Sequence, residues 1–134
     1  MGSLLSSLLA GDAAAAPSQS SESSDHSVKT FHSSARWQLH FNEIKDSSKL
    51  VVIDFSATWC GPCKMMEPIV HAFANEFTDV EFIKIDVDEL SDVAQEFKVQ
   101  AMPTFLLLKN GKEVDKIVGA KKDELKNKIQ KYRA

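Results

Sequence analysis

Residues 50–55 (LVVIDF) form an almost continuous apolar run, and no other feature of the chain limits its fold as strongly. A strand that is apolar on both faces must be covered on both faces, which is typical of a parallel sheet between layers of helices. Parallel strands also need long crossover connections, and these are usually helices. At 134 residues the chain has room for one domain of this kind. We therefore expect residues 50–55 to lie inside a sheet that helices cover on both faces.

The chain around this run supplies the helices and the other strands. Trp37, Phe41 and Ile44 recur at the spacing of an amphipathic helix. Asn110-Gly111 is a strong signal for an antiparallel hairpin. We expect strands at 28–31, 50–55, 80–87, 104–109 and 113–118, and helices at 34–46, 60–77, 89–97 and around Leu125 and Ile129. This order predicts an α/β fold with a central mixed five-stranded sheet flanked by four helices.

Residues 1–27 differ in composition from the rest, and we expect them to form a disordered extension before a domain at 28–134. Serine and small residues dominate there, so little apolar surface is available to offset the entropy of ordering. No Lys or Arg precedes Lys29. A secretory signal begins with basic residues and a transit peptide is rich in arginine, so neither type of address fits.

The first six residues (MGSLLS) match the N-myristoylation pattern, with Gly2 as the acceptor. Such a short pattern also arises by chance, and both interpretations stay open. One myristoyl chain binds a membrane only marginally, at about 10⁴ M⁻¹. No nearby cysteine or basic cluster supplies a second anchor. We therefore expect weak membrane association at most.

Charge and hydropathy argue against two classes of partner. The net charge is −3, with acids and bases interleaved through the second half of the chain. A nucleic-acid-binding protein would favour a basic face, so no nucleic-acid partner is expected. No apolar run approaches the roughly 18 residues that span a bilayer.

The chain has only two cysteines, Cys60 and Cys63, in the motif Cys-Gly-Pro-Cys. A disulfide across so short a loop adds little stability, so their reactivity is the better reason for the pair. The alternative is half of a zinc site, which would need further ligands at suitable spacing. The histidines stand apart from one another, although a metal bridging two chains stays open; they are His26, His32, His40 and His71. We expect no metal.

The motif lies where a central strand ends and a helix begins, which suits thiol chemistry. Backbone N–H groups and the helix dipole stabilise a thiolate at a helix N-terminus, and Pro62 is tolerated in the first turn. These effects lower the pKa of the first cysteine. Cys60 can then attack a target disulfide to form a mixed disulfide, which Cys63 resolves by attacking Cys60.

Residues 59–64 (WCGPCK) after an apolar strand are the signature of thioredoxins, and the chain resembles this family from about residue 28 to its end. Further matches occur in the expected order: Asp54, Pro68, Lys84, Met102-Pro103-Thr104 and Val118-Gly119-Ala120. The resemblance implies the thioredoxin fold and reduction of protein disulfides. Within the family the chain looks most like plant h-type thioredoxins, in the subgroup with an N-terminal extension that begins Met-Gly.

The resemblance assigns a proton relay to Asp54 and an electrostatic tuning role to Lys84. Asp54 interrupts an apolar strand, and burial would raise its pKa towards the range of a general base. On sequence alone, Asp54 could instead reach solvent at a strand end, and Lys84 could point to solvent as strand lysines usually do.

The resemblance also implies a surface that binds the substrate chain around Cys60. Met102-Pro103 would be a cis peptide beside the cysteines, with the Met102 backbone pairing to the substrate strand. Trp59 and Gly119 would belong to the same surface, and Gly61 and Pro62 would tune the redox properties. An ordinary strand-edge proline, a turn glycine and a packed tryptophan are the alternatives for Pro103, Gly119 and Trp59.

The expected partners are a thioredoxin reductase that uses NADPH and disulfide-containing targets such as peroxiredoxins. The resemblance implies no cofactor, a monomer and a cytoplasmic location, with an organelle such as the mitochondrion less favoured. Two other functions compete with reduction. An oxidase or isomerase would share the fold, but isomerases usually carry Gly-His where this chain has Gly61-Pro62. A binding module could use the Met102-Pro103 surface without redox turnover.

Overall fold

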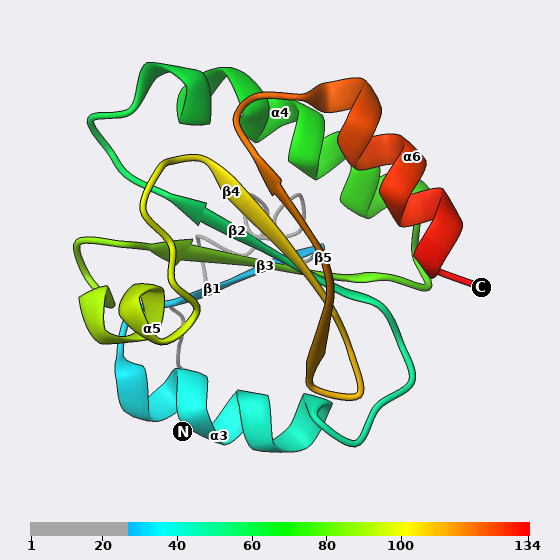
Figure 1. The fold of residues 1–134 in the computed structure, drawn as a ribbon, viewed down its shortest axis with the longest axis horizontal. Helices are drawn as coiled ribbons and strands as arrows, with labels where there is room; N and C mark the ends of the chain where they lie inside the picture. Colours follow the sequence, from blue (N-terminus) through cyan, green and yellow to red (C-terminus); the bar gives the residue numbers. More distant parts are fainter. Residues whose placement is uncertain (1–26) are drawn as a thin grey trace, which may run out of the picture.

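The computed structural model describes residues 27–134, which form one five-stranded sheet covered by four helices (Figure 1). The strands lie in the order β1-β3-β2-β4-β5. β3 is parallel to both β1 and β2, whereas β4 is antiparallel to β2 and β5. The elements are β1 (Val28–Phe31), α3 (Ser34–Ile44), β2 (Val51–Ser56), α4 (Gly61–Glu76), β3 (Glu81–Asp86), α5 (Ser91–Glu96), β4 (Thr104–Lys109), β5 (Lys112–Val118) and α6 (Lys122–Tyr132). The predicted fold class is confirmed.

The sheet separates two apolar cores, as the run at 50–55 predicted. All six residues of β2 are buried. On one face Val52 packs with residues of α4 and α6, and on the other Ile53 packs with residues of α3 and α5. Figure 1 shows these helix pairs on opposite sides of the sheet. The alternation follows from the pleat of a strand, in which successive side chains point to opposite faces.

Several elements begin or end one or two residues away from the predicted boundaries. α5 begins at Ser91 instead of residue 89, because a turn precedes it. In that turn the carboxylate of Asp86 accepts hydrogen bonds from the backbone N–H groups of Asp88 at 2.7 Å and Glu89 at 3.3 Å. α3 ends at Ile44 instead of residue 46. Its N-cap is Ser33, whose hydroxyl oxygen accepts from the N–H of Arg36 at 3.1 Å.

The predicted hairpin joins β4 and β5 through Asn110 and Gly111. Their φ angles are 52° and 74°, and two consecutive positive values are typical of a tight type I′ turn. The Asn110 N–H donates to the carbonyl of Ser47 at 3.0 Å, which ties the turn to the segment between α3 and β2. The hairpin therefore closes the end of the sheet that lies opposite the start of α4.

The predicted extension lies almost entirely outside the described residues, and so does the Gly2 acylation site. The first described residue, Ser27, donates from its hydroxyl to Oδ1 of Asn75 at 2.7 Å, which joins it to the end of α4. Between residues 27 and 134, no helix is both long enough and apolar enough to cross a membrane.

Candidate active site

The connection from β2 to α4 places Cys60 and Cys63 at the N-terminus of the longest described helix. Cys60 is the N-cap residue of α4, and its Sγ accepts a hydrogen bond from the N–H of Cys63 at 3.2 Å. Pro62 lies in the first turn, where its missing N–H leaves no bond unmade. The two sulfurs are joined in a disulfide. The predicted redox pair is therefore assembled here in its oxidised form.

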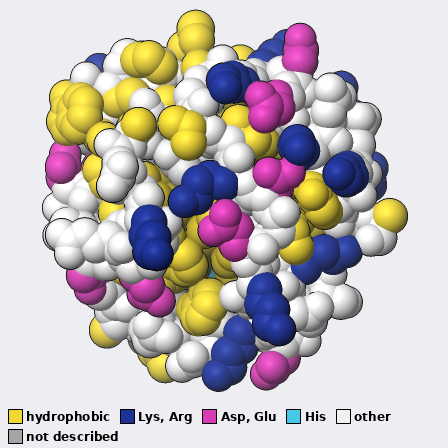
Figure 2. Space-filling view, in the orientation of Figure 1, with side chains coloured by type: hydrophobic (Ala, Val, Ile, Leu, Met, Phe, Trp, Pro, Cys, Tyr) yellow, Lys and Arg dark blue, Asp and Glu magenta, His cyan; other side chains and the backbone are white. Residues whose placement is uncertain are grey.

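The disulfide is recessed beneath the surface. Cys60 and Cys63 are about 5% and 6% exposed, and they pack with Ala57, Val87 and Met102 in a small apolar cluster. Hydrophobic side chains gather on the surface over the start of α4, whereas charged ones dominate the opposite side of this view (Figure 2). An apolar surround of this kind suits contact with the chain of a protein substrate.

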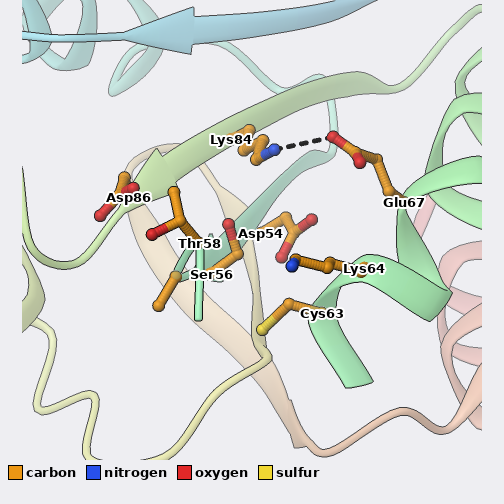
Figure 3. A pocket seen from close by; sticks show the side chains of 9 residues that line it. Asp54, Ser56, Thr58, Cys63, Lys64, Glu67, Lys84 and Asp86 are labelled. Atoms are coloured by element: carbon orange, nitrogen blue, oxygen red, sulfur yellow. Dashed lines mark hydrogen bonds and ion pairs between the residues drawn. The ribbon is translucent and has the colours of Figure 1, made fainter. Parts of the chain in front are cut away.

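Asp54 lies behind the cysteines in a pocket of about 320 Å³ that Cys63 also lines (Figure 3). The side chain is only 6% exposed, so the solvent-facing alternative for Asp54 is wrong. Its Oδ1 is buried, and no described residue donates a hydrogen bond to it. Several polar and charged side chains line the pocket, and it is roomy enough to admit water, which could connect this carboxyl group to Cys63.

Burial dominates the electrostatics of this carboxyl group. The loss of solvent disfavours the charged form and raises the pKa of Asp54 to about 7. The positive charge of Lys84 opposes this shift, and the negative charge of Glu67 adds to it. A carboxyl group with a pKa near neutrality can both accept and release a proton at physiological pH.

Lys84 pairs with a different acid from the one that the resemblance implied. Its Nζ donates to Oε2 of Glu67 at 2.9 Å, and this hydrogen bond holds the pKa of Glu67 below its usual range. Lys84 still lies beside Asp54, because the two are register partners on β3 and β2. Its side chain is one-third exposed, so it lines the pocket instead of standing free in solvent.

The Met102-Pro103 peptide bond is cis, as the resemblance implied. The carbonyl oxygen of Met102 lies 3.6 Å from Sγ of Cys60. Gly119 donates from its N–H to the carbonyl of Pro103 at 2.8 Å, and its φ of 106° favours glycine. Space is open around Gly119, since a Cβ there would meet nothing closer than Lys121 at 3.8 Å. These contacts put Met102 next to the disulfide and Gly119 next to Pro103.

Trp59 lies on the surface, which contradicts the alternative that it is mostly packed. Its side chain is 66% exposed. The indole Nε1 donates to Oδ2 of Asp88 at 2.9 Å, so the ring is held in place by a carboxylate from the segment after β3. A fixed, exposed aromatic ring beside a reactive disulfide offers contact area to a partner at low entropic cost.

Sequence reasoning missed two residues of this site, Glu67 and Asp88. Glu67 follows Cys63 by four positions on α4, and residues at this spacing share a helix face. That spacing could have identified it. No comparable signal marks Asp88, because its contact with Trp59 joins residues 29 positions apart.

In the described part of the chain, no three His, Cys, Asp or Glu side chains lie close enough together to hold a metal ion. The two cysteines bond to each other. The site as described is therefore a disulfide, a buried carboxyl group and an apolar contact surface.

This arrangement defines a dithiol–disulfide oxidoreductase, and comparisons with known proteins agree. The thioredoxin family model matches residues 30–131. Thioredoxin H2 of Arabidopsis thaliana is 60% identical over 134 residues, which cover both chains completely. Thioredoxin H2-1 of Oryza sativa subsp. japonica is 52% identical over 118 residues, covering 88% of this chain and 86% of the relative.

Solved structures give the same result. The crystal structure of thioredoxin NaTrxh from Nicotiana alata is 71% identical, with a TM-score of 0.79, and the match covers 80% of this chain and 93% of that one. A structure that describes thiol resolution in yeast mitochondrial 1-Cys peroxiredoxin via glutathione/thioredoxin systems is 41% identical, with a TM-score of 0.70 and coverage of 78% and 94%. The chain belongs to the thioredoxin family, and it resembles the plant h-type members. It reduces disulfide bonds in target proteins through Cys60 and Cys63.

Proposed function

We propose that Cys60 attacks the target disulfide, that Cys63 resolves the mixed disulfide, and that Asp54 accepts the proton from Cys63. The observation that carries this assignment is the order of the three groups. Cys60 is the N-cap of α4 and lies beside the Met102 carbonyl, Cys63 lines the pocket, and Asp54 lines the same pocket with a carboxyl group of raised pKa.

The first step begins from the reduced protein with Cys60 as a thiolate. The N–H of Cys63 points at Sγ of Cys60 and would stabilise its negative charge. The thiolate attacks one sulfur of the target disulfide, a new bond forms between Cys60 and the target, and the target's own S–S bond breaks. The first target sulfur leaves as a thiolate and takes up a proton.

The second step needs a thiolate on Cys63. We propose that the carboxylate of Asp54 takes the Cys63 proton, through water in the pocket. Cys63 then attacks Sγ of Cys60, the mixed disulfide breaks, and the second target thiolate leaves. Two electrons have passed from the protein dithiol to the target, and the Cys60–Cys63 disulfide remains, which is the state of this structure.

The substrate chain would lie across Trp59, the cis Met102-Pro103 peptide and Gly119. Proximity of the Met102 carbonyl to Cys60 and the open space at Gly119 support this placement. An extended substrate segment could pair with the Met102 backbone by strand addition, so recognition would depend little on the target's sequence.

We propose a thioredoxin reductase that uses NADPH as the electron donor, and peroxiredoxins among the targets. The structural relative that concerns a yeast 1-Cys peroxiredoxin supports the second assignment. We further propose a monomer that acts in the cytoplasm and that Gly2 is myristoylated, giving weak and reversible membrane contact. N-terminal peptide mass spectrometry on protein made in plant cells tests the modification, and an unmodified Gly2 would refute it.

Insulin reduction with NADPH and a thioredoxin reductase tests the function. We expect rapid turnover that Cys60→Ser abolishes and that Cys63→Ser converts into a trapped mixed disulfide on Cys60. A wild-type protein with free thiols that binds targets but reduces none would instead be a binding module. A reduction potential near −180 mV, typical of protein disulfide isomerase, would favour an isomerase over the value of about −270 mV known for thioredoxins.

Asp54→Asn tests the relay separately from the cysteines. We expect slower insulin reduction above about pH 7, where Asp54 is ionised and Cys63 loses its proton acceptor in the variant, and about 10²-fold is the lower range for removal of a general base. The difference should shrink as the pH falls below 7, because the wild-type carboxyl group is then protonated. An unchanged rate from pH 6 to pH 9 would remove Asp54 from the mechanism while leaving the dithiol cycle intact.

A further inference from the structure

Lys84 lies between two carboxyl groups but bonds to only one of them. It is the register partner of Asp54 across β2 and β3, which makes Asp54 its neighbour in the sheet. Its Nζ nevertheless donates to Glu67 of α4, at 2.9 Å. Figure 3 shows the ammonium group directed at Glu67, with the carboxyl group of Asp54 in the same pocket and not bonded to it. Glu67 thus competes for the cation that could otherwise neutralise the buried acid.

We propose that Glu67 is a positioning residue for the disulfide reaction, because it holds the Lys84 ammonium on the α4 side of the pocket and withholds that charge from Asp54. The inference rests on the proposed role of Asp54 as proton acceptor. The Glu67 side chain bonds to Lys84 and not to either cysteine among the described residues, so it acts through Lys84.

Few other charges face Asp54. From α4 the pocket is lined by Lys64 and Glu67 beside Cys63, and from β3 by Lys84 and Asp86. On the other side, the register partner of Asp54 on β4 is Phe105, an uncharged residue. His71 acts on Glu67 from within α4. The contact between Lys84 and Glu67 is the one ion pair found among these pocket residues in the described chain.

Two effects of Glu67 act in the same direction on Asp54. Its hydrogen bond keeps Lys84 from approaching the buried carboxylate, and its own negative charge disfavours a second negative charge nearby. Both effects keep the pKa of Asp54 high. A high pKa makes the carboxylate a stronger base towards the Cys63 thiol, so Glu67 sets the pH range in which the second thiol can be activated.

Glu67→Gln keeps the shape of the side chain and removes its charge. We expect the pKa of Asp54, measured by carboxyl-carbon NMR titration of the oxidised protein, to fall by about half a pH unit, the size expected for one partly screened charge several ångströms away. An unchanged pKa would overturn the proposal. Glu67 is half-exposed, so the variant should fold.

Glu76→Gln is the matched control. Glu76 lies on the same helix, is also half-exposed, and also pairs with a lysine, Lys126, at 3.7 Å. It lies outside the pocket that holds Asp54. We expect no change in the pKa of Asp54 in this variant. A shift equal to that of Glu67→Gln would mean that any charge on α4 has the same effect, and it would overturn the specific role of Glu67.

A double-mutant cycle with Lys84→Gln shows whether Glu67 acts through Lys84. If it does, Glu67→Gln in the Lys84→Gln background should shift the pKa of Asp54 by less than half of its effect in the wild type. Equal shifts in both backgrounds would show that Glu67 acts only by its own charge, and the positioning role would be wrong.

The rate profile separates this inference from the proposed function. If the relay through Asp54 and the role of Glu67 are both correct, the acidic limb of the pH profile for insulin reduction should shift to lower pH in Glu67→Gln. The shift should equal the fall in the pKa of Asp54. A lowered pKa with an unmoved rate profile would refute the relay while leaving the placement of Lys84 by Glu67 intact. An unmoved pKa combined with slow reduction by Asp54→Asn would refute the inference and leave the relay intact.

Discussion

The two ends of the β-sheet differ in how completely their polar groups are paired. At the hairpin end the N–H of Asn110 bonds to Ser47, and Gly111 packs directly against Lys45. At the end where β2 leads into α4, Asp54 keeps a buried oxygen to which no described residue donates a hydrogen bond. Both ends belong to one continuous sheet, so the difference comes from local side chains and not from the fold.

The contrast separates residues that stabilise the fold from residues that perform chemistry. A buried carboxyl group without a donor lowers the stability of the folded state, especially when it is ionised. A close-packed turn with its backbone groups paired raises it. Substitutions should therefore have opposite effects at the two ends: the hairpin end should lose stability and keep activity, while the Asp54 end should gain stability and lose activity.

The largest effect on stability should come from Asp54→Asn. Between pH 3.8 and about 7 the folded protein binds a proton at Asp54 that the unfolded chain has released, so the free energy of unfolding falls as the pH rises through this range. Asparagine cannot ionise. The variant should match the wild type below pH 4 and exceed it by about 4 kcal/mol above pH 7, since each unit of pKa shift corresponds to about 1.36 kcal/mol.

Urea denaturation of the oxidised proteins from pH 3 to pH 9 measures this difference. All other titrating groups are common to both proteins, so the change in the difference with pH reports Asp54. A constant difference across the whole range would mean that burial does not raise the pKa of this residue, and the comparison between the two ends would lose its electrostatic basis.

Gly111→Ala should show the opposite behaviour at the hairpin end. A Cβ on Gly111 would lie 2.7 Å from Cβ and 2.9 Å from Cα of Lys45, and the φ of 74° is strained for alanine. We expect a loss of about 2 kcal/mol in the free energy of unfolding, with little change in the rate of insulin reduction. Thermal denaturation together with the insulin assay gives both quantities.

Gly61→Ala is the stability control for that experiment. A Cβ on Gly61 would meet nothing within 4 Å, and its φ does not fall in the left-handed region. The free energy of unfolding should therefore stay the same or rise slightly, because alanine restricts the unfolded chain. Equal losses in the free energy of unfolding of both variants would show that replacing glycine is costly at either end. The close packing of the hairpin would then not be the cause.

The sequence was sufficient to predict the elements of the fold because the signals are local. The apolar run at 50–55, the helical spacing of Trp37, Phe41 and Ile44, and the Asn110-Gly111 turn each depend on residues close together in the chain. The boundaries were less accurate where a side chain intervened, as in the Asp86 turn that delays α5.

The site was predictable only in part, because its remaining features join distant residues. The cysteine motif is local, and the structure confirms its position at the start of α4. The pairing of Lys84 with Glu67 joins two elements and could not be read from either one. The cis bond before Pro103 came from resemblance alone, because few X-Pro bonds are cis and sequence does not identify them.

The smallest effect should come from Asp88, whose carboxylate holds the exposed ring of Trp59. Asp88→Ala removes this hydrogen bond, and at such an exposed site the loss should be about 0.5–1 kcal/mol. We expect KM for insulin to rise about two- to fivefold with kcat unchanged, because Trp59 would contact the target but take no part in bond exchange. Asp88→Asn keeps an oxygen acceptor and should stay near the wild type. A fall in kcat with KM unchanged would instead place Trp59 among the groups that act on the reacting sulfurs. The catalytic groups at the Asp54 end of the sheet would then include an exposed residue.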